Sequence, residues 1–324
     1  MVAANEGQPA DHGSAGRALV AGLGFGAGEP APPASPVRFP DGGAFRVEIP
    51  SVEGPGPLAA VLDEIEARGL LVHRVSQGSG VMMLSDNEIT EMLDMCDRAQ
   101  VELCLFLGPR ASWDTGAGRY TSAGGLGTRA RGGDQLRYCV DDALRAVELG
   151  VRSLLVGDEG VLWTLHRLRL AGSLPADTRF KVSALIGPAN PASFALFEGI
   201  GADSINVPGD LSLAQLASIR AAGRAAIDLY VESPDNLGGF VRHFEAPELV
   251  RTVAPVYLKF GLRNAPDIYP VGEHLRDVAV RSGRERVRRA ELGMALLDRH
   301  GLLAEASPRG ARDIGPLTRL PAPE

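Results

Sequence analysis

The sequence predicts a single (β/α)8 barrel, the TIM barrel of the α/β class. Eight short β-rich runs alternate with helical patterns along the chain. The early runs are nearly continuous in aliphatic residues, as expected for parallel strands that are covered on both faces. The alternating region is about 255 residues long, which is the usual size of one barrel. An open doubly wound sheet is the competing architecture, and the size favours the barrel.

Each predicted strand is short and rich in Val, Ile, Leu or Phe. The eight runs are FRVEIPSV (45–52), LLVHRVSQ (70–77), VELCLFLG (101–108), RSLLVGDE (152–159), FKVSALIG (180–187), DSINVP (203–208), AIDLYVES (226–233) and VYLKFGLR (256–263).

The segments between the strands have apolar residues at helical spacing. The first, 57–69, stops on Gly69, a residue typical of helix C-termini. The second opens with Ser85 and Glu88, three residues apart, which predicts a capping box. The remaining helices are expected at 134–149, 160–171, 190–200, 212–222, 246–253 and 277–299.

Composition divides the chain into a barrel and two arms. Residues 1–38 are rich in Ala, Gly and Pro and predict a disordered arm, 39–302 form the barrel domain, and 303–324 form a flexible tail. The arm contains GLGFGAG at 22–28, which imitates a dinucleotide fingerprint. That motif requires a strand before it and a helix after it, and here a Pro-rich stretch follows.

The net charge, hydropathy and cysteine content limit the kinds of partner, cofactor and cellular location that the sequence predicts. The net charge of −7 disfavours a nucleic-acid binder, and no apolar run approaches the roughly 20 residues that cross a bilayer. The N-terminus lacks the pattern of a secretory signal. Cys96, Cys104 and Cys139 have no CxxC spacing, so no iron–sulfur cluster is expected, and the protein is predicted to be cytoplasmic.

Lysine is nearly absent from the chain. Of 33 basic residues only Lys181 and Lys259 are lysines, and both fall inside predicted strands. A strongly hydrated ammonium group is costly to bury, so each lysine is expected to have either a compensating charged partner or a function. Barrels often contain internal Lys–Glu pairs that only neutralise each other, which is the favoured interpretation of Lys181. Lys259 lies near the end of its strand, where function is favoured.

Catalytic residues of such barrels lie at the C-terminal ends of strands. Strand parity places about half of the polar strand residues inside the barrel. On this basis the candidate catalytic residues are Glu48, Glu232, His243 and Lys259, and we expect Glu48, Glu232 and Lys259 to share one mouth. The candidate substrate-binding residues are Arg74, Gln77, Arg110, Lys181, Asn206, Arg263 and Asn264.

The glycine-rich segment 108–133 is long for a simple connector, which indicates a lid or binding loop. Arg110, Arg119, Arg129 and Arg131 make it basic and favour an anionic group on the substrate, although solvated arginines would look the same. Coordination of a divalent metal ion by Glu48, Glu232 and His243 remains an open alternative. No HxH or HExxH spacing supports a metal site directly.

The middle of the chain resembles the collagenase-like peptidases of family U32. The resemblance is carried by ALRAVELGVRSLLVGDEGVLWTL, by FKVSALIGPANPASFALFEGIGADSINVPGDLSLAQLASI and by AAIDLYVES. It covers about 100 residues and implies a barrel with an acidic seventh strand. The family's signature cysteines, which hold an iron–sulfur cluster in several members, are replaced here by ESPDNLGGFVRHFE, with Glu232 retained.

Three functions follow from these observations. The leading one is a hydrolase resembling these peptidases, in which Glu232 is the acid/base, Lys259 and Arg263 hold an anionic group, and Glu48 and His243 complete the site. The second is a lyase or aldolase that uses Lys259, or Lys181, as a Schiff base. The third is a non-catalytic binding or accessory protein. The expected partners are a small-molecule or peptide substrate and, as an open alternative, further copies of the chain, with no nucleic acid and no membrane.

Overall fold

The computed structural model describes residues 12–24, 31–110, 127–313 and 318–319, and within them eight parallel strands close into a barrel. The predicted (β/α)8 fold is therefore confirmed. The strands follow one another around the barrel in sequence order, and the last pairs with the first through Glu48 and Lys259. Their bounds are β2 (Phe45–Pro50), β3 (Arg74–Gln77), β4 (Glu102–Phe106), β5 (Ser153–Val156), β6 (Arg179–Val182), β7 (Ser204–Asn206), β8 (Ala226–Glu232) and β9 (Val256–Phe260).

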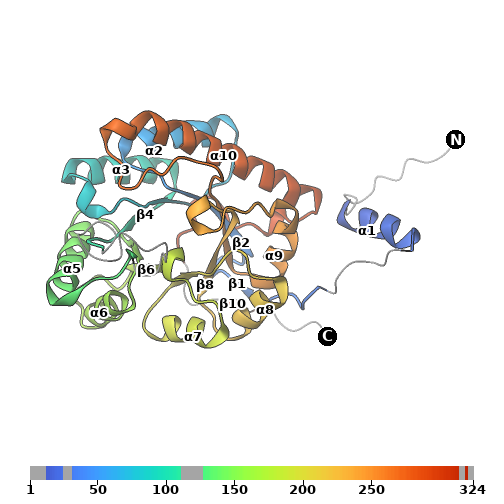
Figure 1. The fold of residues 1–324 in the computed structure, drawn as a ribbon, viewed down its shortest axis with the longest axis horizontal. Helices are drawn as coiled ribbons and strands as arrows, with labels where there is room; N and C mark the ends of the chain where they lie inside the picture. Colours follow the sequence, from blue (N-terminus) through green and yellow to red (C-terminus); the bar gives the residue numbers. More distant parts are fainter. Residues whose placement is uncertain (1–11, 25–30, 111–126, 314–317, 320–324) are drawn as a thin grey trace.

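A helix follows every strand, and the helices surround the barrel (Figure 1). They are α2 (Pro55–Ala67), α3 (Asp86–Ala99), α5 (Gly132–Glu148), α6 (Glu159–Leu170), α7 (Pro191–Gly199), α8 (Leu213–Ala221), α9 (Ala246–Val253) and α10 (Arg276–Arg299). The short 3-10 turns between them are η1 (Val81–Met83), η4 (Ala184–Ile186), η5 (Asp235–Leu237), η6 (His243–Glu245), η7 (Glu273–Leu275) and η8 (Leu303–Glu305).

Side-chain caps fix where several helices begin. Ser85 and Glu88 form the predicted capping box at the start of α3, with reciprocal hydrogen bonds between each side chain and the other residue's amide. Asn190 and Ser212 open α7 and α8 in the same way. Each cap satisfies amide groups that the first helical turn leaves unpaired.

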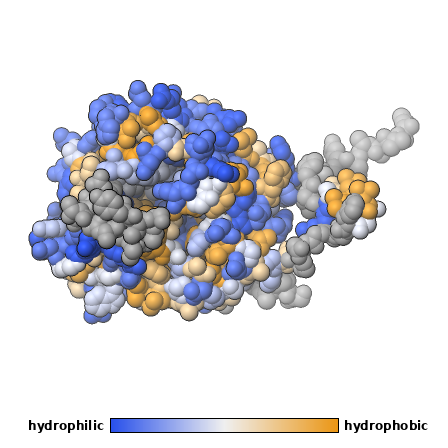
Figure 2. Space-filling model, viewed as in Figure 1, coloured by the Kyte–Doolittle hydropathy of each residue, from blue (hydrophilic) through white to orange (hydrophobic). Residues whose placement is uncertain are grey.

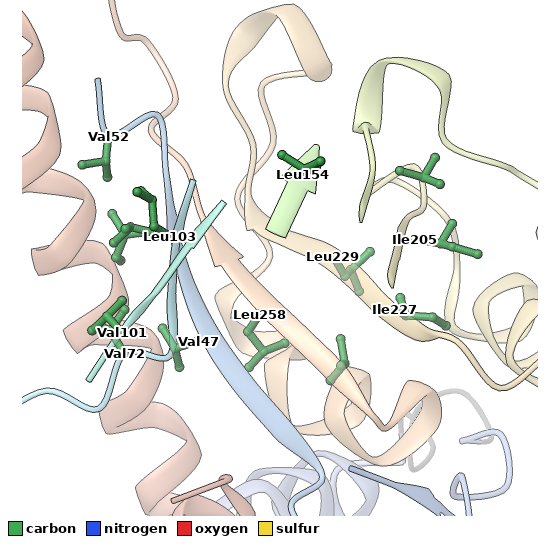
Figure 3. Close-up of a cluster of buried hydrophobic side chains, with 14 of the residues drawn as sticks. Val47, Val52, Val72, Val101, Leu103, Leu154, Ile205, Ile227, Leu229 and Leu258 are labelled. Carbon is green, nitrogen blue, oxygen red and sulfur yellow. The ribbon is translucent and has the colours of Figure 1, made fainter. Parts of the chain in front are cut away.

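The hydrophobic core lies between the strands and the helices. Alternate strand residues point outward and are aliphatic, and Figure 3 shows a set of these side chains, including Val47, Leu154 and Leu258. Helix α10 approaches the barrel closely at Gly293, where an added Cβ would overlap the ring of Phe260. The inward-facing residues, in contrast, are mostly polar or charged, and they provide the candidate site.

The N-terminal end of the barrel is closed by residues that flank it in sequence. Arg46 donates hydrogen bonds to the Tyr257 hydroxyl, the Asp41 carboxylate, the Ser307 hydroxyl and the Asp313 carbonyl, and its guanidinium also lies 4.0 Å from the Phe39 ring centroid. The tail predicted from residue 303 includes two of these partners, Ser307 and Asp313, within its described residues 303–313. Polar groups at the bottom of the barrel need partners, and this segment supplies them.

The N-terminal arm also contains regular elements. Residues 12–22 form α1 (His12–Gly22), and Ser35 donates a hydrogen bond to the Ala254 carbonyl. Two residues, β1 (Val37–Arg38), pair antiparallel with β10 (Thr318–Arg319). Figure 2 shows an apolar patch on α1, apart from the barrel; Leu19 and Val20 of this helix are exposed, as is Leu23 directly after it. The GLGFGAG motif lies partly outside the described residues.

Among the described residues, no helix combines the length and the apolar character needed to span a lipid bilayer.

Candidate functional site

A cluster of charged side chains fills the middle of the barrel, centred on Glu48. The carboxylate accepts hydrogen bonds from Arg74 Nε at 2.7 Å and from the Ser76 hydroxyl at 2.7 Å, and Lys181 Nζ lies 2.5 Å from both of its oxygens. The three partners come from β3 and β6, so the cluster spans the width of the barrel. All four side chains are buried.

Asp228 on β8 is the second carboxylate of this cluster. Its Oδ1 accepts a hydrogen bond from Arg74 and lies 3.6 Å from Lys181 Nζ. The Arg74 guanidinium also lies 3.6 Å from the ring centroid of Tyr257. Sequence reasoning missed Asp228, which lies two residues before Tyr230 on β8 and so has the same strand parity.

The electrostatics of the cluster hold Glu48 in its ionised form. Burial raises the pKa of Glu48, but the positive charges of Arg74, Lys181 and Lys259 outweigh it, so the pKa lies well below its ordinary value. Within ion-pair distance of one another the cluster contains three cations and two carboxylates. Glu48 therefore acts as a counter-ion, and a proton-transfer role is unfavourable for it.

Lys259 is the cation of this cluster with the weakest ionic contact. Its Nζ donates a 2.6 Å hydrogen bond to Asn206 Oδ1, lies 4.1 Å from the ring centroid of Tyr230, and is 3.7 Å from Glu48 Oε1. Asn206 is itself held by a 2.6 Å bond from its Nδ2 to the Val182 carbonyl. Because Lys259 and Asn206 stand at or next to the last residues of β9 and β7, this group lies toward the C-terminal end of the barrel.

Glu232 does not share that interior. The pairing of β8 with β9 shifts between Tyr230 and Glu232, so Glu232 pairs with the outward-facing Phe260. Its carboxylate lies 3.4 Å from His243 Nε2 and 3.7 Å from Arg289 Nε on α10. The expectation of one mouth shared by Glu48, Glu232 and Lys259 is therefore corrected, because this bulge turns Glu232 toward the helix layer.

The surroundings of Glu232 favour its ionised form. Burial raises the pKa of Glu232, but the adjacent His243, the hydrogen bond from the Arg263 amide at 3.0 Å and the charge of Arg289 lower it below its ordinary value overall. A carboxylate with a lowered pKa is a poor proton donor near neutral pH.

Two predicted binding residues instead support the loop after β3. The Gln77 amide bonds to both the amide and the carbonyl of Gly80, which closes the turn. Arg110 donates to the carbonyls of Gly78 and Ser79 at 2.8 Å, and burial lowers its pKa to about 10. Arg110 also lies 3.9 Å from the ring centroid of Phe106, an inward-facing residue at the end of β4.

A second set of buried and half-buried groups lies beside this loop, and sequence reasoning missed two of them, Tyr269 and Arg286. Tyr269, in the segment between β9 and α10, bonds to the Ser51 hydroxyl, and Arg286 on α10 donates to the Ser51 carbonyl at 3.3 Å. Glu53 accepts from the amides of Gly78 and Ser79. These residues come from loops and from a helix, so strand parity could not reveal them.

The remaining predicted residues lie elsewhere. Arg263 and Asn264 are exposed in the loop after β9. Arg119 and most of the predicted lid fall outside the described residues, whereas Arg129 pairs with Glu159 at the start of α6. Within the described part of the chain, no group of three His, Cys, Asp or Glu side chains is arranged to hold a metal ion.

Comparison with known proteins adds little beyond the fold. No protein-family profile matches the chain, and no curated protein is significantly similar to it in sequence. Solved structures that it resembles include a U32 peptidase (17% identity, 58% of this chain and 69% of the other, TM-score 0.39). Others are a candidate fructose-1,6-bisphosphate aldolase from Coccidioides immitis (11%, 81% and 94%, 0.46) and a thiamine phosphate pyrophosphorylase from Pyrococcus furiosus (12%, 76% and 98%, 0.40). The resemblance to U32 peptidases is weak and concerns the fold alone.

Proposed function

We propose that the protein is an enzyme of the lyase or aldolase type in which Lys259 forms an imine with a carbonyl substrate. The observation that carries this proposal is the contrast between the two lysines. Lys181 contacts both oxygens of Glu48, whereas the nearest partner of Lys259 Nζ is the neutral side-chain amide of Asn206. Lys181 is thereby assigned a structural role as a counter-ion, and Lys259 remains as the reactive amine.

The chemistry needs an amine, a proton donor and a polar support. The neutral Lys259 amine attacks the carbonyl carbon, and loss of water from the resulting carbinolamine gives the imine. The protonated imine then accepts the electron pair of the Cα–Cβ bond as that bond breaks, which gives an enamine, while the other fragment loses its hydroxyl proton and leaves as an aldehyde. Protonation of the enamine carbon and hydrolysis of the imine by water release the second product and regenerate the amine. Burial raises the pKa of Tyr230, so its hydroxyl stays protonated at neutral pH, and the Tyr230 ring lies beside Lys259 with its centroid 4.1 Å from Nζ.

The composition of the chain makes the test unusually clean. Lys181 and Lys259 are the only lysines, so the chain offers two side-chain amines. We would incubate the protein with pyruvate or dihydroxyacetone phosphate, reduce with cyanoborohydride, and map the adduct by mass spectrometry. The expected result is an adduct on Lys259 that disappears in Lys259→Arg and persists in Lys181→Arg. An adduct on Lys181, or none on either lysine with any carbonyl probe, would overturn the proposal.

A hydrolase is the second candidate, favoured by the pairing of Glu232 with His243. Their side chains lie 3.4 Å apart, and both contacting atoms are buried without a hydrogen bond that meets normal geometry. Such a pair could orient water for attack on an ester or peptide. Hydrolysis of a chromogenic ester or peptide panel that falls at least tenfold in Glu232→Gln, and stays unchanged in Lys259→Arg, would support this candidate over the first.

A further inference from the structure

Arg286 is a buried cation with few partners. It lies on α10, yet only 4% of the residue is exposed. Its one hydrogen bond among the described residues is the 3.3 Å contact from an Nη atom to the Ser51 carbonyl, and its Nε has no partner there. Within the same described ranges, no carboxylate lies within 4.0 Å of it. Burial lowers the pKa of Arg286, as expected for a charge that is incompletely compensated.

Other buried arginines of the barrel are better satisfied. Arg46, at the N-terminal end, donates to four separate acceptors, and one of them is the Asp41 carboxylate. Arg220 on α8 also has no partner on Nε, but it donates to the carbonyls of Ala225 and Gly223 and so fastens the turn after its own helix. Among the described residues, Arg286 has neither a carboxylate partner nor a pair of carbonyl acceptors. Its hydrogen bonding therefore does not compensate for the cost of burying its charge.

Glu53, the carboxylate that acts electrostatically on Arg286, already accepts hydrogen bonds from other groups. Glu53 acts on Arg286 electrostatically, but its two oxygens accept from the amides of Gly78 and Ser79 at 2.6 and 3.0 Å. Arg110, in the segment that follows β4, donates to the carbonyls of the same two residues. Both oxygens of Glu53 are thus occupied by this turn, and Arg286 has no carboxylate in ion-pair contact among the described residues.

Strand β2 relates this charge to the proposed reactive amine. Arg286 donates to the carbonyl of Ser51, the residue directly after β2 ends at Pro50. Glu48 of β2 pairs in register with Lys259 of β9, and Lys259 lies one residue before the end of that strand. Arg286 and Lys259 therefore both lie at the C-terminal end of the barrel beside β2, one on the outer helix layer and one inside the barrel.

We propose that Arg286 binds the oxoanion of the substrate, a carboxylate or a phosphate ester, while the carbonyl of the same molecule reacts at Lys259. A guanidinium group forms paired hydrogen bonds with either anion, which would satisfy the donors that the protein leaves free. The substrate class is accordingly an anionic carbonyl compound. This inference deepens the proposed function and rests on it for the carbonyl half of the ligand.

Anion binding is measured directly, without turnover. Isothermal titration with inorganic phosphate and, separately, with acetate would be carried out on the unmodified protein and on Arg286→Met, Arg286→Lys and Arg220→Met. We expect one anion to bind, with affinity reduced about tenfold or more in Arg286→Met, less in Arg286→Lys, and unchanged in Arg220→Met. Which of the two anions binds identifies the phosphate or the carboxylate class. Urea unfolding of each variant shows whether it is folded, and Arg286→Lys keeps the test decisive if Arg286→Met is not.

The outcomes separate this inference from the proposed function. Lys259→Arg retains Arg286 and should still bind the anion although it forms no adduct. Anion binding that depends on Arg286, without any adduct on Lys259, would refute the imine mechanism and leave the anion site standing. Equal anion affinity in Arg286→Met and the unmodified protein, or no binding of either anion, would refute the anion site whatever the trapping shows.

Discussion

Lys181 Nζ lies 2.5 Å from both carboxylate oxygens of Glu48, and the contact joins β6 to β2 across the inside of the barrel. Both side chains are fully buried. A buried ion pair gains stability only when its geometry is good and its remaining polar atoms are bonded, and Glu48 meets this condition through Arg74 and Ser76. The charged interior is therefore part of what holds the barrel closed.

Removing the charge of Glu48 should destabilise the protein strongly. Glu48→Gln leaves Arg74 and Lys181 with Asp228 as their remaining carboxylate in ion-pair contact among the described residues, and leaves Lys259 with none there. We therefore expect a loss of about 3–5 kcal/mol in the free energy of unfolding, measured by urea denaturation. The control is Glu285→Gln, which removes a partly exposed partner of Arg288 and should change little. Similar stability for both variants would contradict the role given to the cluster.

His73 should make the fold sensitive to mild acid. Its Nδ1 accepts from the Val47 amide and its Nε2–H donates to the Ser307 carbonyl, which requires the neutral ring. Burial lowers its pKa from 6.5 to about 4. The unfolded chain therefore binds the proton more readily, so this contribution is complete above pH 6.5 and is lost as the pH falls toward 4, by up to about 3 kcal/mol.

The measurement is the free energy of unfolding of His73→Gln and the unmodified protein at pH 7 and pH 4.5. The variant should lose less stability than the unmodified protein over this interval, since the titrating ring is gone. His274→Gln, at an exposed position, is the control and should keep the original pH dependence. An identical slope in His73→Gln would show that the ring does not titrate as described.

Asp142 should have the opposite pH dependence. Burial raises its pKa to about 6, so the folded state binds the proton more tightly than the unfolded chain does. Its ionisation costs stability as the pH rises from about 4 through 6, and Asp142→Asn should be more stable at pH 7.5 by up to about 3 kcal/mol, with little gain at pH 4. The asparagine oxygen can still accept the 3.2 Å bond from the Gly108 amide.

Thermal unfolding at the two pH values tests this, with Asp141→Asn as the neighbouring control. Asp141 is exposed and paired with Arg137, so its substitution should give no such pH-dependent gain. A gain of equal size at pH 4 and pH 7.5 in Asp142→Asn would be inconsistent with a titration effect.

Gly293 should resist the substitution that usually stabilises a helix. Gly→Ala in a helix typically gains up to about 1 kcal/mol. At Gly293 the new methyl group would overlap the Phe260 ring, so we expect Gly293→Ala to lose about 1–3 kcal/mol in chemical denaturation. Gly133 on α5 has no atom within 4 Å of the added carbon, and Gly133→Ala should be neutral or stabilising. A stabilised Gly293→Ala would mean that α10 can move away from β9 at no cost.

The sequence predicted the barrel well because strand periodicity is a local pattern. For the charged strand residues, parity predicted only that about half lie inside, and the structure brings Glu48, Lys181 and Lys259 together there. The alternation rule fails at Glu232, because a shift in strand pairing after Tyr230 reverses the side-chain direction. The sequence AIDLYVES contains no signal that predicts this shift. Arg286 could not be predicted from the sequence for another reason. Helix α10 contains several arginines, and tertiary packing determines that Arg286 is buried.

The antiparallel pairing of Val37–Arg38 with Thr318–Arg319 has a consequence for how the chain can be connected. The entry into the barrel unit and the exit from it are hydrogen-bonded neighbours, so the polypeptide runs almost as a ring. A short linker across that point, with new ends opened in a surface turn such as the one between α6 and β6, should give a circular permutant that keeps all eight β/α units in their original cyclic order.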